Sequence, residues 1–344
     1  DQVGHTKFRQ VTGSVIVDGS LFRLPGGPFG FAAGAVFRRA RIRDVPPAAS
    51  LEGDVYNGGA AGITAGKDRV FELFGEVEAP LLRDRTLFHD LTLLASARYT
   101  NYKSYGSTGT YRLGAQWAPV QEIRFRGSYG TAFRAPNLFE QFVADQTGFA
   151  PAGSDPCDDF ASKSAPGQPL YDNCLSQVGA FLNEDTDGDG TFDNWVATGG
   201  PGVIRNGGAG ILKAEKSKSY GIGMVITLPP RVADVSLAID YFNLRVDDQV
   251  SVLGTTILDL CYEAEDFPNN QYCAFIEPRE QLQGTLQNFR DPYINIALQK
   301  ATGIDIAARY GTELMGGRFV ANLRATRNLK QIIQTFPEDD PFDY

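Results

Sequence analysis

Gly127-Ser-Tyr-Gly-Thr-Ala-Phe-Arg-Ala-Pro-Asn-Leu-Phe-Glu-Gln-Phe142 is the stretch of sequence that decides the fold. In the residues that lead into it, apolar or aromatic side chains alternate with polar or small ones from Ile123 to Gly130. This is the period-2 signature of a β-strand with two unlike faces. The alternation stops at Pro136, because proline donates no ladder hydrogen bond and disfavours helix at the residue before it. The stretch is therefore a strand that enters a long loop.

The rest of the sequence contains nine further segments of this kind, separated by turn-forming residues. We predict strands at 15–24, 29–41, 71–79, 91–99, 111–117, 123–134, 219–228, 234–246, 304–310 and 319–326. Short and long connections alternate along this list, with a connector around Arg83-Asp-Arg85 and a moderate loop from Asn101 to Gly109. All the long loops then fall at one end of an antiparallel sheet, as in outer-membrane barrels. The two longest loops are 134–210 and 247–290, and we expect both to be extracellular.

Composition agrees with a membrane sheet. No run of about 18 apolar residues exists in the 344-residue chain, which excludes a transmembrane helix. Glycine (38), phenylalanine (23) and tyrosine (14) are abundant, and they suit pleated strands and interfacial aromatic girdles. A net charge of −9 argues against a nucleic-acid partner, because phosphates require a basic face. The first residues do not resemble a signal peptide.

Charged residues gather on one face of several strands. They are the carboxylates Glu72, Glu76 and Glu78 and the arginines Arg98, Arg124, Arg126 and Arg324. Such a face cannot enter a dry core without partners, so we predict an all-β, antiparallel transmembrane β-barrel with a wet lumen wider than ten strands would enclose. The four arginines either contact an anionic cargo or pair with the glutamates, and we favour pairing. By the same reasoning, we expect Arg134 to hold the start of its loop.

The four cysteines lie in the two longest loops, as Cys157 and Cys174 and as Cys261 and Cys273. An even number in polar loops without neighbouring histidines favours disulfides over a zinc site. Three connectivities are open, and we favour the two local pairs. They imply an oxidising compartment or the cell surface.

One acidic segment has the spacing of a metal loop. Asp185, Asp187, Asp189 and Asp193 surround Gly188 and Gly190, and carboxylates at alternate positions beside glycine are able to wrap Ca²⁺. The position of the bidentate EF-hand glutamate is Val196, so we do not expect an EF-hand, and a shorter calcium loop in which Asp193 substitutes is the hypothesis. The other interpretation is a solvated loop tip. We predict no other cofactor.

No enzyme constellation is present. The only histidines are His5 and His89, which leaves almost no material for a Ser-His-Asp or zinc arrangement. Gly221-Ile-Gly223 lies inside a strand rather than before a helix, so it is not a dinucleotide fingerprint. We expect no catalysis.

Several stretches resemble the TonB-dependent outer-membrane receptors. Gly127–Phe142 carries the strongest resemblance, with Tyr129, Phe133, Arg134, Pro136 and Asn137 in the family's SYGTAFRAPNL pattern. Four further stretches are also similar to the family: Ala214–Tyr220, Ala238–Asn243, Gly303–Asp305 and the cysteine loop Leu260–Cys273. Alanine stands at position 214 where the family usually has proline.

This resemblance implies a barrel of about 22 strands around a plug, in the outer membrane of a Gram-negative bacterium. It also implies active uptake of a scarce large solute, such as a siderophore–iron complex, cobalamin or an oligosaccharide. Its partners would be outer-membrane lipid, the cargo and the TonB–ExbB–ExbD complex. We interpret residues 1–344 as an internal part of such a barrel, without plug or closing strands. The alternatives are a passive porin-like or structural barrel and a secreted, calcium-stabilised adhesin.

Overall fold

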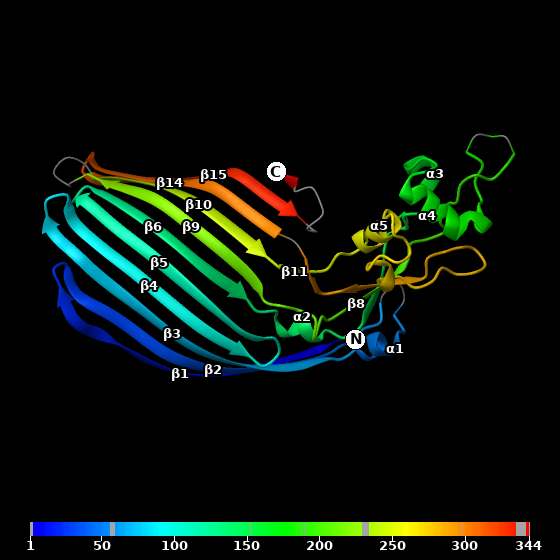
Figure 1. Ribbon diagram of the computed structural model, residues 1–344, viewed down its shortest axis with the longest axis horizontal. Coiled ribbons are helices and arrows are strands. Elements are labelled where there is room, and N and C mark those ends of the chain that lie inside the picture. Colours follow the sequence, from blue (N-terminus) through cyan, green and yellow to red (C-terminus); the bar gives the residue numbers. More distant parts are fainter. Residues whose placement is uncertain are drawn as a thin grey trace.

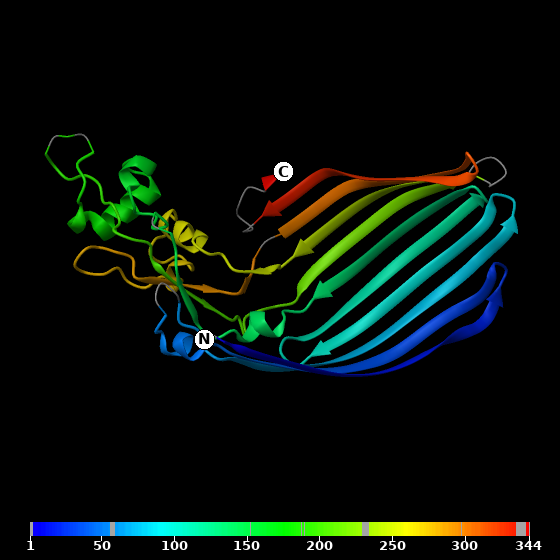
Figure 2. The same ribbon diagram turned by 180° about the vertical axis from the view of Figure 1, so that it is seen from behind.

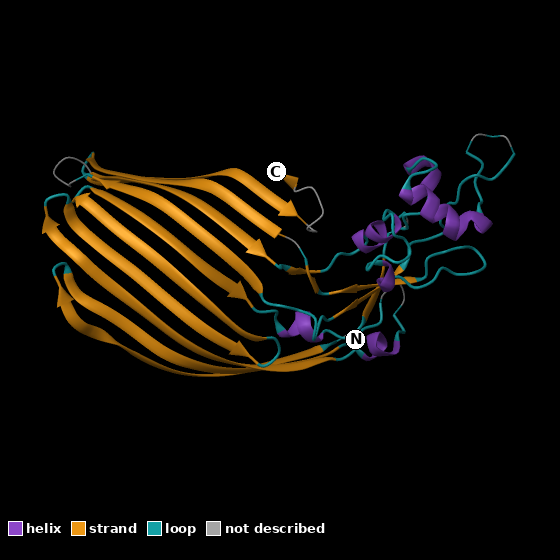
Figure 3. Cartoon of the chain, in the orientation of Figure 1, coloured by secondary structure: helices purple, strands orange, loops and turns teal. Residues whose placement is uncertain are grey.

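The computed structural model describes residues 3–55, 59–151, 153–186, 188, 190–228, 234–296, 298–334 and 342–343. Ten long antiparallel strands form one curved sheet (Figures 1 and 3). They are β1 (His5–Leu24), β2 (Gly27–Val45), β3 (Thr64–Arg85), β4 (Phe88–Tyr102), β5 (Gly106–Val120), β6 (Ile123–Arg134), β9 (Glu215–Thr227), β10 (Asp234–Asp247), β14 (Leu298–Leu314) and β15 (Gly317–Gln334). Each strand pairs with the next in this order, and the two-residue strand β16 (Phe342–Asp343) pairs with β15. The predicted all-β antiparallel fold is confirmed.

Two predicted connections were wrong. The connector around Arg83-Asp-Arg85 belongs to β3, because Arg83 pairs with Asp90 and Arg85 with Phe88 across a tight turn. Most of the predicted loop from Asn101 to Gly109 is also strand, since Tyr102 pairs with Gly106. The first strand begins earlier than predicted, at His5. In all three places polar residues obscure the alternation of side chains, and the strand is recognised only by its pairing with the neighbouring strand.

The register places unlike side chains on the two faces of the sheet. One face, which we call the apolar face, carries exposed large hydrophobic and aromatic side chains from β2 to β15. They include Phe37, Phe71, Leu73, Tyr99, Leu113, Trp117, Tyr129, Ile222, Ile306, Tyr310 and Leu323. The opposite face, which we call the polar face, carries the charged residues Glu72, Glu76, Arg98 and Arg126. This division agrees with a sheet that meets hydrocarbon on one side and water on the other.

The long connections all lie at one end of the sheet, together with the three-residue turn between β4 and β5, and the opposite end carries short turns, as Figures 1 and 2 show. The connection from β2 to β3 contains α1 (Ala48–Glu52). Between β6 and β9 lie α2 (Leu138–Phe142), β7 (Gln146–Phe149), α3 (Phe160–Lys163), α4 (Pro169–Val178), a 3₁₀ helix (Gly179–Phe181) and β8 (Gly202–Asn206). Between β10 and β14 lie β11 (Val250–Ser251), α5 (Thr256–Tyr262), a 3₁₀ helix (Cys273–Phe275), β12 (Asn288–Pro292) and β13 (Ile294–Asn295).

The two longest connections fold together into one body, which we call the loop unit. Strand β8 from the first connection pairs with β7 on one side and, in parallel, with β12 from the second connection. Helices α3, α4 and α5 gather beyond this small sheet, away from the long strands (Figure 1). No helix in the described residues has the length and apolarity needed to cross a membrane.

Candidate functional site

Several ion pairs join strands on the polar face of the sheet. Arg126 donates from Nε to Oδ1 of Asp240 over 2.7 Å, across β9. Arg98 lies 3.5 Å from Oε2 of Glu72, a carboxylate whose side chain is only 9% exposed. Arg98 also lies over the Phe74 ring, 5.1 Å from its centroid. The charged side chains of the polar face are therefore held by ion pairs between strands.

A groove of about 550 Å³ runs along this face. Its lining includes Glu76, Arg112, Gln116, Arg126 and Asp240, together with the small residues Gly114, Gly221 and Gly223. The glycines have no side chains to fill the groove, and both acidic and basic side chains line it. Such a surface is able to hydrogen-bond a polar solute or a protein domain seated against it.

The other two candidate arginines occupy one cross-strand row. Arg124 on β6 and Arg324 on β15 lie at its two ends, with Val225, Ala238 and Ala307 between them. The structure thus brings all four predicted arginines onto the same face but not into one cluster. A role of these arginines in binding cargo stays a prediction.

Arg134, the last residue of β6, joins three segments. Its guanidinium donates to Oε2 of Glu215 over 2.7 Å and to both carboxylate oxygens of Glu140 over 3.0 and 3.1 Å. Glu215 in turn accepts the backbone N–H of Val250 over 2.8 Å. The start of the first long connection is therefore tied to β9 and to the second long connection through one arginine.

The residues after Arg134 form a capped helix. Asn137 accepts the backbone N–H groups of Phe139 and Glu140 over 2.8 and 2.9 Å, and Glu140 accepts the N–H of Asn137 over 2.8 Å. This reciprocal capping box satisfies the free donors at the start of α2. Pro136 precedes the cap, and its carbonyl accepts Nε2 of Gln141 over 2.8 Å. The motif's polar residues are thus used to shape the strand-to-loop transition.

The aromatic residues of the motif lie on the sheet. Tyr129 on β6 pairs with Leu113 on β5 and with Tyr220 on β9. Its ring centroid lies 6.0 Å from that of Tyr111. Phe133 meets the Tyr102 ring edge-on at 6.2 Å. Such aromatic pairs stabilise neighbouring strands.

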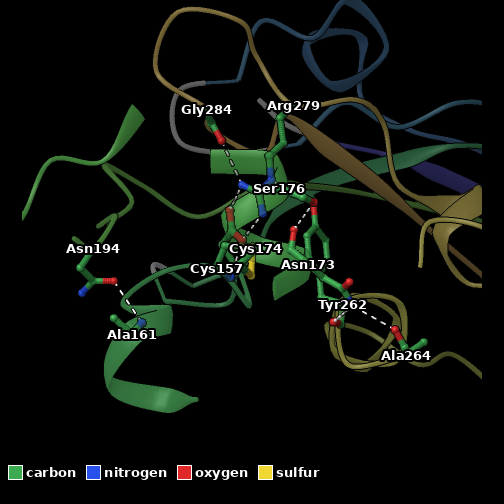
Figure 4. The surroundings of a disulfide bond; sticks show 11 residues. Cys157, Ala161, Asn173, Cys174, Ser176, Asn194, Tyr262, Ala264, Arg279 and Gly284 are labelled. Atoms are coloured by element: carbon green, nitrogen blue, oxygen red, sulfur yellow. Dashed lines mark hydrogen bonds and ion pairs between the residues drawn. A yellow bond between two sulfur atoms is a disulfide. The ribbon is translucent and has the colours of Figure 1, made fainter. Parts of the chain in front are cut away.

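Both local disulfides are confirmed, as Cys157–Cys174 and Cys261–Cys273. Although each disulfide lies within one connection, the two connections are not separate bodies. Cys157, Cys174 and Cys261 all belong to one buried core with Phe160, Val178, Trp195 and Tyr262. Asn173 beside the first disulfide donates to the carbonyls of Tyr262 and Ala264 over 2.8 and 2.9 Å (Figure 4). The two connections therefore share a single core.

A buried ion pair lies at the centre of this core. Arg279 donates to Asp155 over 2.6 Å, to the Tyr262 hydroxyl over 3.0 Å and to the Gly284 carbonyl over 3.0 Å (Figure 4). Its guanidinium lies 5.4 Å from the Trp195 ring centroid. The side chains of Arg279 and Asp155 are 5% and 2% exposed. Burial raises the pKa of the Tyr262 phenol, an effect that the charge of Arg279 partly offsets.

Two of the four candidate calcium ligands, Asp185 and Asp193, lie among the described residues. Asp185 accepts the backbone N–H groups of Gly188 and Gly190 over 2.7 and 2.8 Å. Asp193 accepts both the N–H and the hydroxyl of Thr186, and these hydrogen bonds hold the pKa of Asp193 below its usual value. Asp187 and Asp189 lie outside the described residues. Among those that are described, no three His, Cys, Asp or Glu side chains are grouped to hold a metal.

Several residues of these networks escaped the sequence analysis. Asp240 lies in a strand that its alternation and the family-like stretch Ala238–Asn243 both indicated, and Glu215 lies in the family-like stretch Ala214–Tyr220, but neither was singled out. Asp155 and Arg279 lie in loops without periodicity. The signal available for Asp240 was its position on the charged face of its strand. Arg279 and Asp155 are 124 residues apart, and no local pattern connects them.

Comparison with known proteins agrees with this architecture. A family model described as "TonB dependent receptor-like, beta-barrel" matches residues 3–343. The vitamin B12 transporter BtuB of Vibrio cholerae is 38% identical over 50 residues, which are 14% of this chain and 8% of that protein.

Solved structures share the fold at low sequence identity. The ferric enterobactin receptor PfeA of Pseudomonas aeruginosa superposes with a TM-score of 0.58 at 13% identity, over 97% of this chain and 40% of that one. The siderophore receptor PirA of Acinetobacter baumannii gives a TM-score of 0.53 at 11% identity, over 98% and 41% of the two chains. The hemophore receptor HasR of Serratia marcescens gives 0.55 at 14%, over 95% and 42%.

The chain spans about 40% of the length of these solved receptors. The family consists of non-enzymatic outer-membrane proteins of Gram-negative bacteria, which agrees with the two-faced sheet and with the localisation expected from the sequence. Because the family model covers the chain almost from end to end, this protein belongs to the TonB-dependent receptors, and the ten strands are part of their β-barrel.

Proposed function

We propose that this chain is part of a receptor that actively takes up a scarce large solute across the outer membrane, with energy from the TonB–ExbB–ExbD complex. The observation that carries the proposal is the two-faced sheet. Its apolar face suits lipid, and its polar face, with the Arg126–Asp240 and Arg98–Glu72 pairs and the groove between strands, suits the lumen of a wide barrel.

The loop unit supports the same proposal. It lies at the end of the sheet where the long connections gather (Figures 1 and 2), which we assign to the outside of the cell. Two disulfides and a buried ion pair hold it together. A binding surface that is rigid before its ligand arrives loses less entropy on binding, so the loop unit suits a cargo-binding role.

The cargo class is proposed from the relatives. Their names include receptors for ferric enterobactin and a hemophore and a transporter for vitamin B12. We therefore propose an iron–siderophore complex or cobalamin as the first cargoes to test, with oligosaccharides as the third class.

The test uses the full-length gene product that contains this chain. A strain lacking the gene should lose growth on one limiting cargo, regain it with the gene supplied in trans, and lose it again when TonB is removed. Uptake that persists without TonB would indicate a passive barrel. A product that fractionates with the medium instead of the outer membrane would indicate the adhesin, and either outcome would end the proposal.

A calcium ion bound by Asp185, Asp187, Asp189 and Asp193 would rigidify the tip of the loop unit. The spacing of these aspartates in the sequence is the observation behind this proposal, and calorimetric titration with Ca²⁺ tests it.

A further inference from the structure

The loop unit carries a large excess of negative charge. Its two connections, residues 135–214 and 248–297, contain 19 Asp and Glu residues against five Lys and Arg residues, which gives a net charge of −14. Because the whole chain has a net charge of −9, the other residues together carry +5. A calcium ion bound in the Asp185–Asp193 loop would still leave the unit at −12. The negative charge therefore belongs to the loop unit and not to the chain in general.

The few cations of the unit are used internally. Three of the five form ion pairs within it, namely Arg205–Asp291, Arg279–Asp155 and Arg290–Asp145. Burial raises the pKa of Asp259, and the nearby ammonium group of Lys163 partly offsets this effect. Lys213 remains as the fifth cation. An anionic solute would thus find almost no free positive charge on this surface, and the carboxylates would repel it.

Carboxylates, in contrast, are available to a ligand. Six of them are exposed and form no ion pair with a described residue: Asp172, Glu184, Asp248, Glu263, Glu265 and Asp266. Asn173, the neighbour of Asp172 in α4, donates to the carbonyl groups of Tyr262 and Ala264, on either side of Glu263. Four of the six therefore lie where α4 meets the end of α5, and a cation near them would reduce their mutual repulsion.

The same unit presents an apolar side chain on a fixed turn. Leu282 is 85% exposed. Glu280 accepts the backbone N–H groups of Leu282 and Gln283 over 2.7 and 2.8 Å. The indole of the buried Trp195 donates to the Gln283 carbonyl over 3.0 Å and ties the turn to the core. Because this backbone is already held, an apolar contact to Leu282 costs little ordering entropy on binding.

Further apolar side chains are exposed on the unit, and they are Phe149, Phe192 and Ile211. The surface thus combines carboxylates with apolar contacts. The groove on the polar face has no such bias, because two carboxylates and two arginines line it: Glu76, Asp240, Arg112 and Arg126. Discrimination between solutes by charge is therefore expected at the loop unit and not in the groove.

We propose that the loop unit selects a cationic solute that also carries apolar groups, and that it disfavours anionic solutes. This inference rests on the proposed function, in which the loop unit faces the cell exterior and contacts the cargo. Its net charge attracts a cation over roughly 8 Å at physiological ionic strength. The exposed apolar side chains contact the uncharged part of the solute. Among iron–siderophore complexes, those with a protonated amine fit this surface better than polyanionic ones.

The test measures binding of one ferric core in three charge states to the purified full-length receptor. The probes are ferrioxamine B, whose free amine is protonated, its N-acetyl derivative, which is neutral, and its N-succinyl derivative, which is anionic. Because the ferric trihydroxamate core is the same in all three, differences in affinity report the charge.

Two pairs of variants separate the charge from the apolar contact. Asp172→Asn/Glu265→Gln/Asp266→Asn removes three carboxylates from the loop unit, and its matched control removes three from the short-turn end, Asp84→Asn/Glu122→Gln/Glu313→Gln. Leu282→Asn removes the apolar side chain of the fixed turn. Its control is Leu87→Asn, at an exposed leucine of the β3–β4 turn. Heat-modifiable migration verifies that each variant barrel is folded.

The parent should bind the cationic probe on the order of a hundredfold more tightly than the anionic one, with the neutral probe between them. The association rate of the cationic probe should fall as the salt concentration rises. The carboxylate variant should lower the cationic-to-anionic ratio roughly tenfold, and its control should keep the ratio. Leu282→Asn should weaken all three probes alike, by roughly tenfold, and Leu87→Asn should weaken none.

Four outcomes would overturn the inference: equal affinity for the three probes, tighter binding of the anionic probe, an unchanged ratio in the carboxylate variant, or no binding of any probe. Unchanged affinities in Leu282→Asn would refute the apolar contact. Uptake is measured separately. A receptor whose TonB-dependent cargo is neutral or anionic refutes this inference alone, and one that prefers the cationic probe but transports it without TonB refutes only the proposed active uptake.

Discussion

The buried pair of Arg279 and Asp155 offers the sharpest test of how the loop unit is held together. Replacing Arg279 by methionine keeps the apolar stem but removes the charge that neutralises Asp155. That carboxylate is 2% exposed and would keep only the backbone N–H of Cys157, 3.0 Å away. The change also removes the hydrogen bonds to the Tyr262 hydroxyl and the Gly284 carbonyl. Breaking a buried pair on one side costs about 3–5 kcal/mol.

Hydrogen exchange of the full-length receptor measures this cost locally. In Arg279→Met, amides of residues 157–181 and 257–289 should exchange roughly a hundred to several thousand times faster than in the parent. Amides in β4 and β5 should be unchanged, because those strands share no core with the loop unit. Asp155→Asn/Arg279→Met should cost less than the sum of its two single changes, since it leaves no lone buried charge.

Arg290→Met is the matched control. Arg290 lies in β12 of the same unit, and its pair with Asp145 at 3.5 Å joins side chains that are 47% and 58% exposed. A surface pair of this kind contributes about 0–1 kcal/mol. If Arg279→Met accelerated exchange no more than Arg290→Met, the pair would not be holding the two connections together, and the reasoning from burial would be refuted.

Three further predictions concern the loop unit. Replacing either disulfide by serines should cost about 3 kcal/mol and increase exchange in both connections, because Cys157, Cys174 and Cys261 share one core; faster exchange confined to the connection that carries the changed pair would contradict a common core. Burial raises the pKa of Tyr262, so its contribution to stability is fully present below the unfolded value of about 10 and is lost as pH rises toward the folded value. Exchange-derived stability should therefore fall more steeply above pH ~10 in the parent than in Tyr262→Phe, and parallel curves would exclude this origin. Calorimetric titration of the full-length receptor with Ca²⁺ should give saturable heat near roughly millimolar concentration that Asp185→Asn/Asp193→Asn abolishes, and absence of heat in the parent would remove the calcium hypothesis.

Much of the barrel was predictable because a strand carries its own signature. The alternation of side chains along Phe71–Ala79 or Ile123–Gly130 indicates which residues share a face. The glycines and prolines of Pro25-Gly-Gly-Pro28 or the glycines of Met315-Gly-Gly317 indicate where the chain reverses. These signals depend on neighbours two or three residues away. They sufficed for all ten strands and for the unlike faces that separate lipid from water. Where the alternation was masked by polar residues, as at Arg83–Arg85 and Tyr102, the strand ends were wrong.

The candidate site was predictable only in part, for the same reason. The local disulfides lie 17 and 12 residues apart in sequence, and the charged face follows from strand parity. Which arginine meets which carboxylate depends on strand order, so the sequence indicated pairing with glutamates but did not indicate Asp240 as the partner of Arg126.

What the sequence by itself determined is the set of alternating strands, most of the turns between them and the resemblance to a receptor family, and it favoured the two local cysteine pairs among three connectivities. Only the tertiary structure decided that the two longest connections form one body, through the parallel pairing of β8 with β12 and the meeting of Asp155 with Arg279. The physical reason is the distance along the sequence over which each interaction acts. Strand pleating and turn geometry are dictated by adjacent residues, whereas a core shared by distant segments forms only after the strands between them have brought those segments to the same end of the sheet.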